Sequence, residues 1–458
     1  MSIFDTDDTA WSALTKTFET IMQPPESRIV VQAPTVFRPL DINSGVEQHL
    51  AIFRKLLVGD KIPAYGNKNT NSYIDTGASV QMAYGQYLQG LNVSLTTRYA
   101  STQDQQKIID LRTKYNDAAH ALRTFEKTAE ADWKQQKLAN PGLSRIDWDN
   151  NYGDIGYTPM LKELTDDVTE RYGYWQGAAH PYPELTRVIN RIYDYDNNPA
   201  NAIYLPETTD DLSDPPESWT RFLKTNLNLP DDFFTHDAVQ DVALNQSSST
   251  STNYESRWEA GGSVSYGFFS IGGSAGGGNI EDHLRAGTQN LTFSFKRLVP
   301  VEVLRGQWYD EGLLAAPFNT YVDASEYWNR GGQLPLIPTT ALIGRGLEVS
   351  IQTSSTVFDE FQSWYHSSGS LGFSFGPWSV GGGANQSTSS SSITNTSSGT
   401  TLSFTDDSDT PYIIAVASIK MEDWVNSRSE AMAIGREKLE QLIRSATERD
   451  HKVPKLVE

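Results

Sequence analysis

The stretch SVSYGFFSIGGSAGGG, residues 263–278, alternates small polar with large apolar side chains and then runs into glycine. The stretch SLGFSFGPWSVGGGA, residues 370–384, repeats this pattern later in the chain. Alternation with a period of two predicts strands that have one apolar face. The alternation slips at Phe268–Phe269 and breaks at GPW (376–378), where an extra residue predicts a β-bulge or a similar irregularity. Both stretches are therefore predicted to be arms of related β-hairpins.

The similarity extends well beyond these two stretches and predicts an internal duplication. Each copy has a Ser/Thr-rich arm, an apolar arm, a Gly/Ser-rich stretch and a short return arm, LTFSF at 291–295 and LSF at 402–404. We place the two hairpin units at about residues 242–308 and 348–424. In the alignment, Gln246, Trp258, Leu291, Phe293 and Trp308 recur as Gln352, Trp364, Leu402, Phe404 and Trp424.

The first half of the chain is predicted to be helical. Apolar residues spaced by three and four form a heptad seam over 101–139, with a capping box at Ser101 and Asp104 and an NPG stop at 140–142. We expect this helix to pair with an antiparallel segment at 73–92, with an intermolecular coiled coil as the alternative. Shorter helices are predicted near 11–21, from Thr158, around 185–192 and over 427–447.

These patterns predict an α+β fold. It comprises a helical domain over 1–240 with one long helix, a duplicated antiparallel β-hairpin module over 241–425, and a C-terminal helix and tail over 426–458. The segment 194–217, rich in Asp, Asn and Pro, is predicted to be a linker or surface loop. The apolar segment LPLIPTTALIGRG, residues 334–346, is predicted to be core.

Composition restricts the function classes. The 37 basic against 57 acidic residues give a net charge of −20, which repels phosphate backbones and argues against nucleic-acid binding. No cysteine is present, so disulfides and thiol chemistry are excluded. The N-terminus lacks the basic and apolar regions of a signal peptide. We therefore expect a protein synthesised in soluble form in the cytoplasm, with release by lysis or non-classical export left open.

Known catalytic and metal-binding patterns find little support. Two G-x-S-x-G matches, around Ser274 and Ser374, lack the following helix that a nucleophile elbow requires. Asp194, Asp196 and Asn198 mimic the start of a calcium loop, but Pro199 takes the glycine position. We expect no enzyme activity, cofactor or metal.

The strongest functional signal is the absence of charge. Phe361–Thr405 and Ala260–Ile280 contain no Asp, Glu, Lys or Arg. Exposed loops ordinarily carry charge, so these segments are expected to contact the chain's own core, a neighbouring subunit or lipid. The residues predicted to face a membrane or a neighbouring subunit are Val264, Tyr266, Phe269, Ile271, Leu371, Phe373, Phe375, Trp378 and Val380.

The pattern resembles, in a generic way, the Ser/Thr-rich hairpins of β-pore-forming toxins. This resemblance implies a homo-oligomer that inserts two amphipathic hairpins into a membrane. The alternative is a soluble self-assembling ring, tube or shell in which the hairpins pair between subunits, since uncharged strands make good pairing edges. The expected partners are other copies of the chain and, under the first hypothesis, a lipid membrane. Binding of carbohydrate or a receptor by exposed aromatic residues is a third class.

Overall fold

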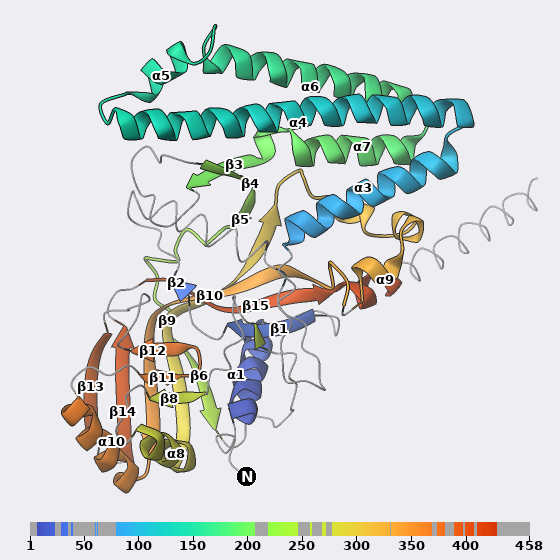
Figure 1. Cartoon of the computed structure of the whole chain (residues 1–458). Helices are drawn as coiled ribbons and strands as arrows, with labels where there is room; N and C mark the ends of the chain where they lie inside the picture. The colour runs from blue at the N-terminus through green and yellow to red at the C-terminus, as the bar shows by residue number, and fades with distance from the viewer. Residues whose placement is uncertain are drawn as a thin grey trace, which may run out of the picture. The chain divides into compact units, whose positions relative to one another are not determined.

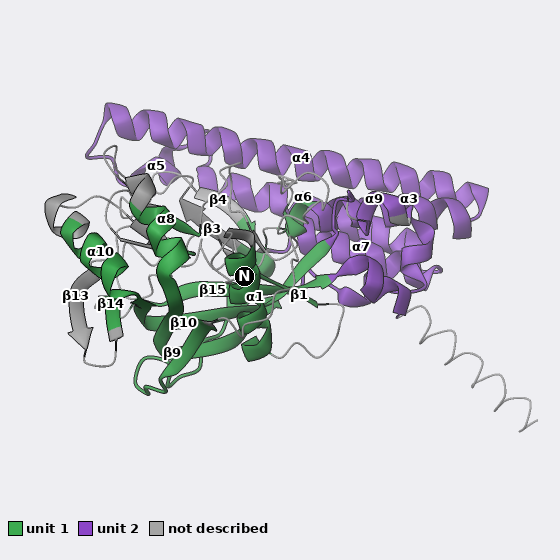
Figure 2. Ribbon diagram, turned by 90° about the horizontal axis from the view of Figure 1, so that it is seen from below, with its two compact units in different colours: residues 1–82, 199–306, 336–419 green, residues 83–198, 307–335, 420–458 purple. Residues whose placement is uncertain are grey.

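The protein has a mixed α+β fold with an antiparallel sheet, seen in a computed structural model (Figure 1). The structure describes residues 7–22, 29–34, 38–39, 60, 62, 79–206, 219–245, 257–258, 268–271, 277–329, 331–368, 373–380, 389–396, 399–406 and 410–427. Two compact units divide the chain (Figure 2). Unit 1 comprises 1–82, 199–306 and 336–419, and unit 2 comprises 83–198, 307–335 and 420–458. The sequence had instead suggested contiguous domains with a boundary near 240.

Unit 2 is built on helices that begin and end where local signals place them. The long helix α4, Thr102–Ala139, begins after Ser101, whose hydroxyl accepts a hydrogen bond from the Asp104 N–H. It ends at Ala139, and Asn140 caps it directly before Pro141 and Gly142. The prediction of this helix and its cap is therefore confirmed. The other helices are α3 (Val80–Tyr99, whose first three residues belong to unit 1), α5 (Arg145–Asn151), α6 (Tyr157–Ala179) and α7 (Pro183–Asp196).

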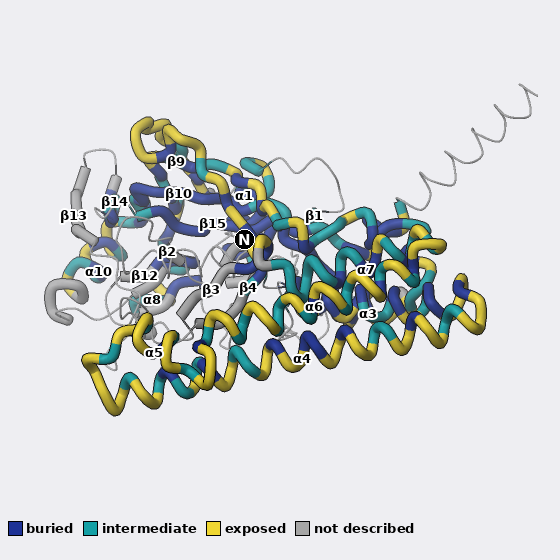
Figure 3. Tube along the Cα trace, turned by 90° about the horizontal axis from the view of Figure 1, so that it is seen from above, coloured by how far each residue is buried: buried dark blue, intermediate teal, exposed yellow. Residues whose placement is uncertain are grey.

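The heptad seam of α4 is buried within unit 2, but its partner differs from the prediction. Ile108, Tyr115 and Leu122 are buried, and buried positions alternate with exposed ones along α4 (Figure 3). The helix packs mainly on α6, where Trp175 lies 5.1 Å from the Tyr115 ring, measured between centroids. The expected partner, 73–92, instead contributes α3, and a sequence seam alone does not select between two apolar helices of similar length.

Unit 1 contains a ten-stranded sheet. One path through it runs β13-β14-β10-β15-β1-β7, and β9 joins β10 to β5 and β6. The strands are β1 (Ile29–Pro34), β2 (Arg38–Pro39), β5 (Thr225–Leu227), β6 (Gln240–Asn245), β7 (Arg257–Trp258), β9 (Thr288–Arg305), β10 (Leu336–Thr353), β13 (Ser389–Thr396), β14 (Gly399–Asp406) and β15 (Tyr412–Lys420). The predicted core segment 334–346 supplies the first part of β10, and most of its apolar residues are buried.

Each predicted repeat unit contributes one strand pair, and the two pairs have the same register when Leu244 is matched with Ile351, one residue away from the predicted match of Gln246 with Gln352. In the first unit β6 pairs with β9, and in the second β10 pairs with β14. The pair β9–β10 joins the two repeat units within unit 1. Four antiparallel strands therefore lie in the order β6-β9-β10-β14. Two rows of fully buried apolar residues cross these strands: Val242, Phe293, Val349 and Phe404, and Leu244, Leu291, Ile351 and Leu402.

These rows form the main core of unit 1. The core also includes helix α1 (Asp7–Met22), which buries Trp11, Leu14 and Phe18 as its sequence periodicity predicts. Leu284 of α8 (Gly277–Gly287) joins it, as do buried phenylalanines of α10 (Ser355–Ser368). A second cluster contains residues from the other halves of β9 and β10, together with β15 and Phe233. The long strands therefore connect two apolar cores.

Two expectations differ from the observed elements, and a third falls outside the described residues. The predicted linker 194–217 contains the end of α7 and strand β3 (Ala202–Pro206), which pairs with β4 (Trp219–Leu223). The return arms pair with β6 and β10, whereas the described parts of the apolar arms pair with each other. Alternation reveals which face is apolar but leaves the partner strand unspecified. The predicted C-terminal helix 427–447 lies outside the described residues except at 427.

Candidate functional site

The described parts of the two apolar arms form a small sheet of their own. Strands β8 (Phe269–Ile271), β11 (Phe373–Phe375) and β12 (Trp378–Val380) are arranged in the order β12-β11-β8. Phe375 is opposite Phe269, and Phe373 is opposite Ile271, so the arms of the two repeat units pair directly. Among the predicted site residues, Val264, Tyr266 and Leu371 lie outside the described residues.

Three of the predicted site residues are buried in the core of unit 1. Phe269 is 1% exposed, Phe375 is fully buried and Trp378 is 3% exposed. The Phe375 ring lies 5.9 Å from Phe404 and 6.2 Å from Trp378, measured between centroids. In this state of the molecule these aromatic side chains contact the chain itself, so exposure to lipid or to a subunit would require the small sheet to leave the core.

A tight turn joins β11 to β12 at the GPW sequence. Phe375 and Trp378 face each other across two turn residues, and Gly376 has a φ of +56°. Glycine reaches this left-handed region without the steric cost that a Cβ would add. The Gly376 N–H donates to the Phe268 carbonyl at 2.6 Å, which ties the turn to the residue preceding β8. The break in alternation thus marks a hairpin turn.

The edge of the large sheet is the second part of the candidate site. Strand β13 has the sequence SSSSITNT and pairs with β14 from Ser389↔Asp406 to Thr396↔Gly399. Among the described strands it is the terminal one on its side of the sheet. It carries neither charge nor proline, although most proteins protect an edge strand with such residues. At the other side of the four-strand series, β6 pairs only with β9 among the described strands. The missing charge is visible in the sequence, whereas the edge position of β13 follows only from its pairing with β14.

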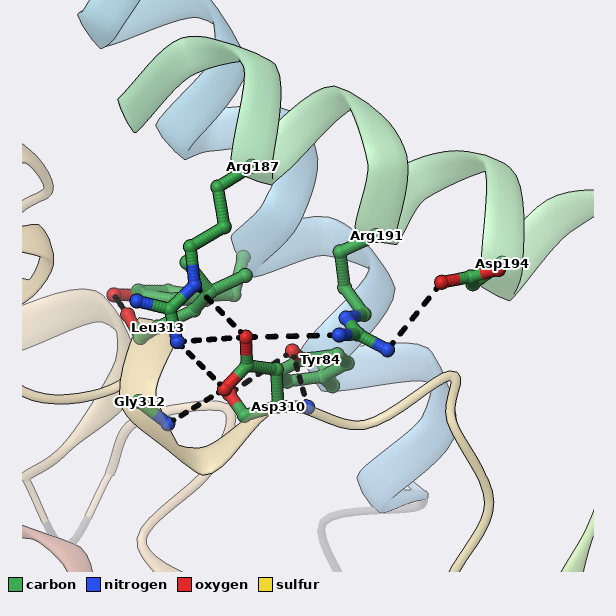
Figure 4. Close-up of polar contacts among 8 residues, drawn as sticks. Tyr84, Arg187, Arg191, Asp194, Asp310, Gly312 and Leu313 are labelled. Atoms are coloured by element: carbon green, nitrogen blue, oxygen red, sulfur yellow. Dashed lines mark hydrogen bonds and ion pairs between the residues drawn. The ribbon is translucent and has the colours of Figure 1, made fainter. Parts of the chain in front are cut away.

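A polar cluster in unit 2 holds the Asp310 carboxylate between the guanidinium groups of Arg187 and Arg191 (Figure 4). Asp310 accepts hydrogen bonds from the Arg187 guanidinium at 2.8–3.0 Å, and Arg191 lies 3.6 Å from the same carboxylate. The Asp310 N–H donates to the Tyr84 hydroxyl, and the Gly312 N–H donates to the carboxylate, both at 2.9 Å.

This cluster has the character of a structural anchor. Burial raises the pKa of Tyr84 well above its usual value, so its hydroxyl remains protonated and serves as a hydrogen-bond partner. The neighbouring Tyr87 hydroxyl donates to the Leu313 carbonyl at 2.6 Å. The carboxylate, both guanidinium groups and both hydroxyls are thus engaged with the protein, and they fix the segment beginning at η3 (Glu311–Leu313) onto α3 and α7.

One carboxyl group in unit 1 has a perturbed acidity. Burial raises the pKa of Asp60 to about 6, although the Gln81 N–H at 2.7 Å and the Ser79 side chain oppose that rise. Ser79 accepts from the Met82 N–H, so both side chains cap the first turn of α3. The contacts of Asp60 are those of a helix cap.

No group of three His, Cys, Asp or Glu side chains in the described part of the chain could hold a metal ion. None of the described helices is long and apolar enough to cross a membrane. No protein-family model, curated protein or solved structure matches the chain.

Proposed function

We propose that this chain is the non-enzymatic subunit of a homo-oligomer and that its subunits join at the edges of the unit 1 sheet. The observation that carries the proposal is β13, an eight-residue edge strand with no charge and no proline. An edge strand of this composition is open to strand pairing with another chain, either beside β13 or in its place on β14. The uncharged surroundings in the sequence, Phe361–Thr405, favour a protein neighbour over solvent.

Size-exclusion chromatography with light scattering, over a range of concentrations, tests this proposal. The wild-type chain is expected to form particles several times the mass of one chain. Ser390→Lys with Ser392→Lys adds two charges to β13 and is expected to shift the concentration at which assembly begins at least tenfold, upward if a neighbour pairs outside β13 and downward if a neighbour replaces β13 on β14. Thr124→Lys with Thr128→Lys, at exposed positions of α4, is the matched control and should assemble as wild type does. A wild-type chain that stays monomeric throughout would refute the proposal.

A second candidate function is membrane insertion after assembly, with the nine predicted residues facing lipid. The observation that favours it is the small sheet β12-β11-β8, which joins the uncharged arms of both repeat units and is separate from the ten-stranded sheet. Insertion must first expose the Phe269, Phe375 and Trp378 side chains. This costs about 5–9 kcal/mol at roughly 1.5–3 kcal/mol per large apolar side chain, which burial in lipid would offset.

Dye leakage from liposomes tests insertion. Because the sequence contains no cysteine, an introduced disulfide can be formed and reduced without competing native thiols. Ser270 and Ser374 are opposite each other on β8 and β11, so Ser270→Cys with Ser374→Cys can tie the two arms together. Leakage by wild type is expected, with loss in the oxidised variant and recovery after reduction. Intact liposomes with wild type, or equal leakage by the oxidised variant, would contradict insertion of these arms.

A further inference from the structure

The register of the repeated strands defines where another strand of the same kind would fit. In the series β6-β9-β10-β14, β6 and β10 hold equivalent places, as do β9 and β14. Leu291 on β9 faces Leu244 of β6 on one side and Ile351 of β10 on the other. Leu402 on β14 faces Ile351 on one side, so continuation of the series would place a second Leu244 on its other side.

That place is occupied by β13, which matches β6 in direction and, at Ile393 in the place of Leu244, in apolar character. Ile393 is opposite Leu402 and Ser391 is opposite Phe404, which are the positions that Leu244 and Val242 of a further β6 would take. Residues 389–394, SSSSIT, thus correspond to residues 240–245, QDVALN. By register, β13 therefore has an apolar residue type opposite Leu402 and a serine opposite Phe404.

Strand direction argues against simple addition of a neighbour outside β13. All the pairings from β6 through β9, β10 and β14 to β13 are antiparallel, so β13 and β6 run in the same direction. In a head-to-tail assembly of identically oriented subunits, a β6 placed beside β13 would form a parallel pair. Removal of β13 leaves the series β6-β9-β10-β14 in each subunit, and β6 of the neighbour then meets β14 in the antiparallel sense of the repeat.

We propose that β13 occupies the docking position of a second copy, and that assembly displaces it so that β6 of the neighbouring copy pairs with β14. The expected register places Val242 of the neighbour opposite Phe404 and Leu244 of the neighbour opposite Leu402. This inference rests on the proposed homo-oligomeric function and specifies its interface. The edge of β6, which has no further partner among the described strands, becomes the donor.

The exchange makes assembly depend on concentration. The β13–β14 pairing belongs to one hairpin, with Thr396 opposite Gly399, so the covalent link gives β13 a high effective concentration. A neighbouring β6 can replace β13 only when the protein concentration is high enough. Its pairing is favoured by a second apolar residue, because Val242 would lie opposite Phe404 where β13 has Ser391. Each subunit donates one edge and accepts at another, which is a heterologous contact that leads to a closed ring or an open filament.

Two cysteine pairs test the exchange in the full-length chain. Ser392→Cys with Ser403→Cys joins residues opposite each other on β13 and β14, and its disulfide should hold β13 in place. The oxidised variant is expected to remain monomeric at concentrations where wild type assembles, and to assemble after reduction. Thr113→Cys, an exposed single-cysteine variant on α4, controls for oxidation itself and should assemble under both conditions.

The second pair reports the new neighbours. Ala243→Cys with Ser403→Cys cannot close within one chain, because β9 and β10 separate β6 from β14 and the Cα atoms are roughly 14 Å apart at about 4.8 Å per strand. In the proposed register, Ala243 of the neighbour lies opposite Ser403. Oxidation of the assembled variant should therefore yield a ladder of covalent multimers on a non-reducing gel.

The outcomes separate this inference from the function on which it rests. A wild-type chain that is monomeric at every concentration contradicts both. Assembly that persists in the oxidised Ser392/Ser403 variant, or that produces no Ala243–Ser403 multimers, overturns strand exchange while homo-oligomerisation stands. A two-chain particle without the multimer ladder would indicate a symmetric pairing of β13 with itself, and it also overturns the exchange.

Discussion

Substitution of Phe404 tests the described packing of the unit 1 core. Its side chain is fully buried on β14, opposite Val349. Its ring lies 5.5 Å from Trp378, 5.9 Å from Phe375 and 6.3 Å from Phe361, measured between centroids. Phe404→Ala removes the contacts that link the large sheet to β11, β12 and α10. We expect a loss of about 4 kcal/mol, since buried Phe→Ala changes typically cost roughly 3–5 kcal/mol.

Phe234→Ala is the matched control in the same unit. Phe234 is 36% exposed, and one ring contact is recorded for it, to Phe233 at 5.0 Å. Its truncation should cost about 1 kcal/mol or less, because surface truncations leave little cavity behind. Differential scanning calorimetry should show a melting temperature for unit 1 that is lower by roughly 6–12 °C in the Phe404 variant than in the control. Equal shifts in the two variants would refute this description of the core.

Three further predictions concern other positions. A pKa of about 6 means that folded unit 1 binds a proton at Asp60 more tightly than the unfolded chain does, so this group stabilises the fold below about pH 4 and loses that contribution as pH rises through 6. As the pH rises from 4 to 7.5, the free energy of unfolding of Asp60→Asn, measured with urea, should therefore increase by up to about 3 kcal/mol relative to that of wild type. A difference between the two proteins that does not change with pH would contradict the burial of this carboxyl. Asp310→Asn should lower the stability of unit 2 by about 1–3 kcal/mol, since Arg187 loses its charged partner and Arg191 keeps only Asp194, whereas Asp166→Asn at an exposed pair should be neutral; equal effects would show that Asp310 is no anchor. Gly376→Ala should cost about 1–2 kcal/mol because its φ is +56°, while Gly177→Ala inside α6 should be neutral or stabilising; the reverse order in thermal melts would rule out the turn geometry.

The elements that depend on local signals were predictable from the sequence. The cap at Ser101, the heptad seam and the NPG stop define α4 without reference to the rest of the chain. Trp11, Leu14 and Phe18 likewise define the buried face of α1. The alternation also identified strands at β8, β11 and β12, because the period of two is a property of each segment alone.

The pairing of these elements could not be predicted in the same way. Phe269 lies opposite Phe375, a residue of the other repeat unit, and alternation is equally compatible with pairing inside one unit. The anchor joins Arg187 to Asp310 across 123 residues of sequence, with no motif to connect them. Strand β13 was missed because serine and threonine runs are typical of loops and strand edges alike, and only the register with β14 distinguishes them.

Homo-oligomerisation through the sheet edge is tested most directly by the mass of the purified wild-type chain in solution. Light scattering coupled to size-exclusion chromatography, repeated across a hundredfold range of concentration, measures that mass. We expect the mass to rise from that of one 50.9 kDa chain to a multiple of it as concentration increases. A mass that stays at 50.9 kDa over the whole range would contradict the proposed function.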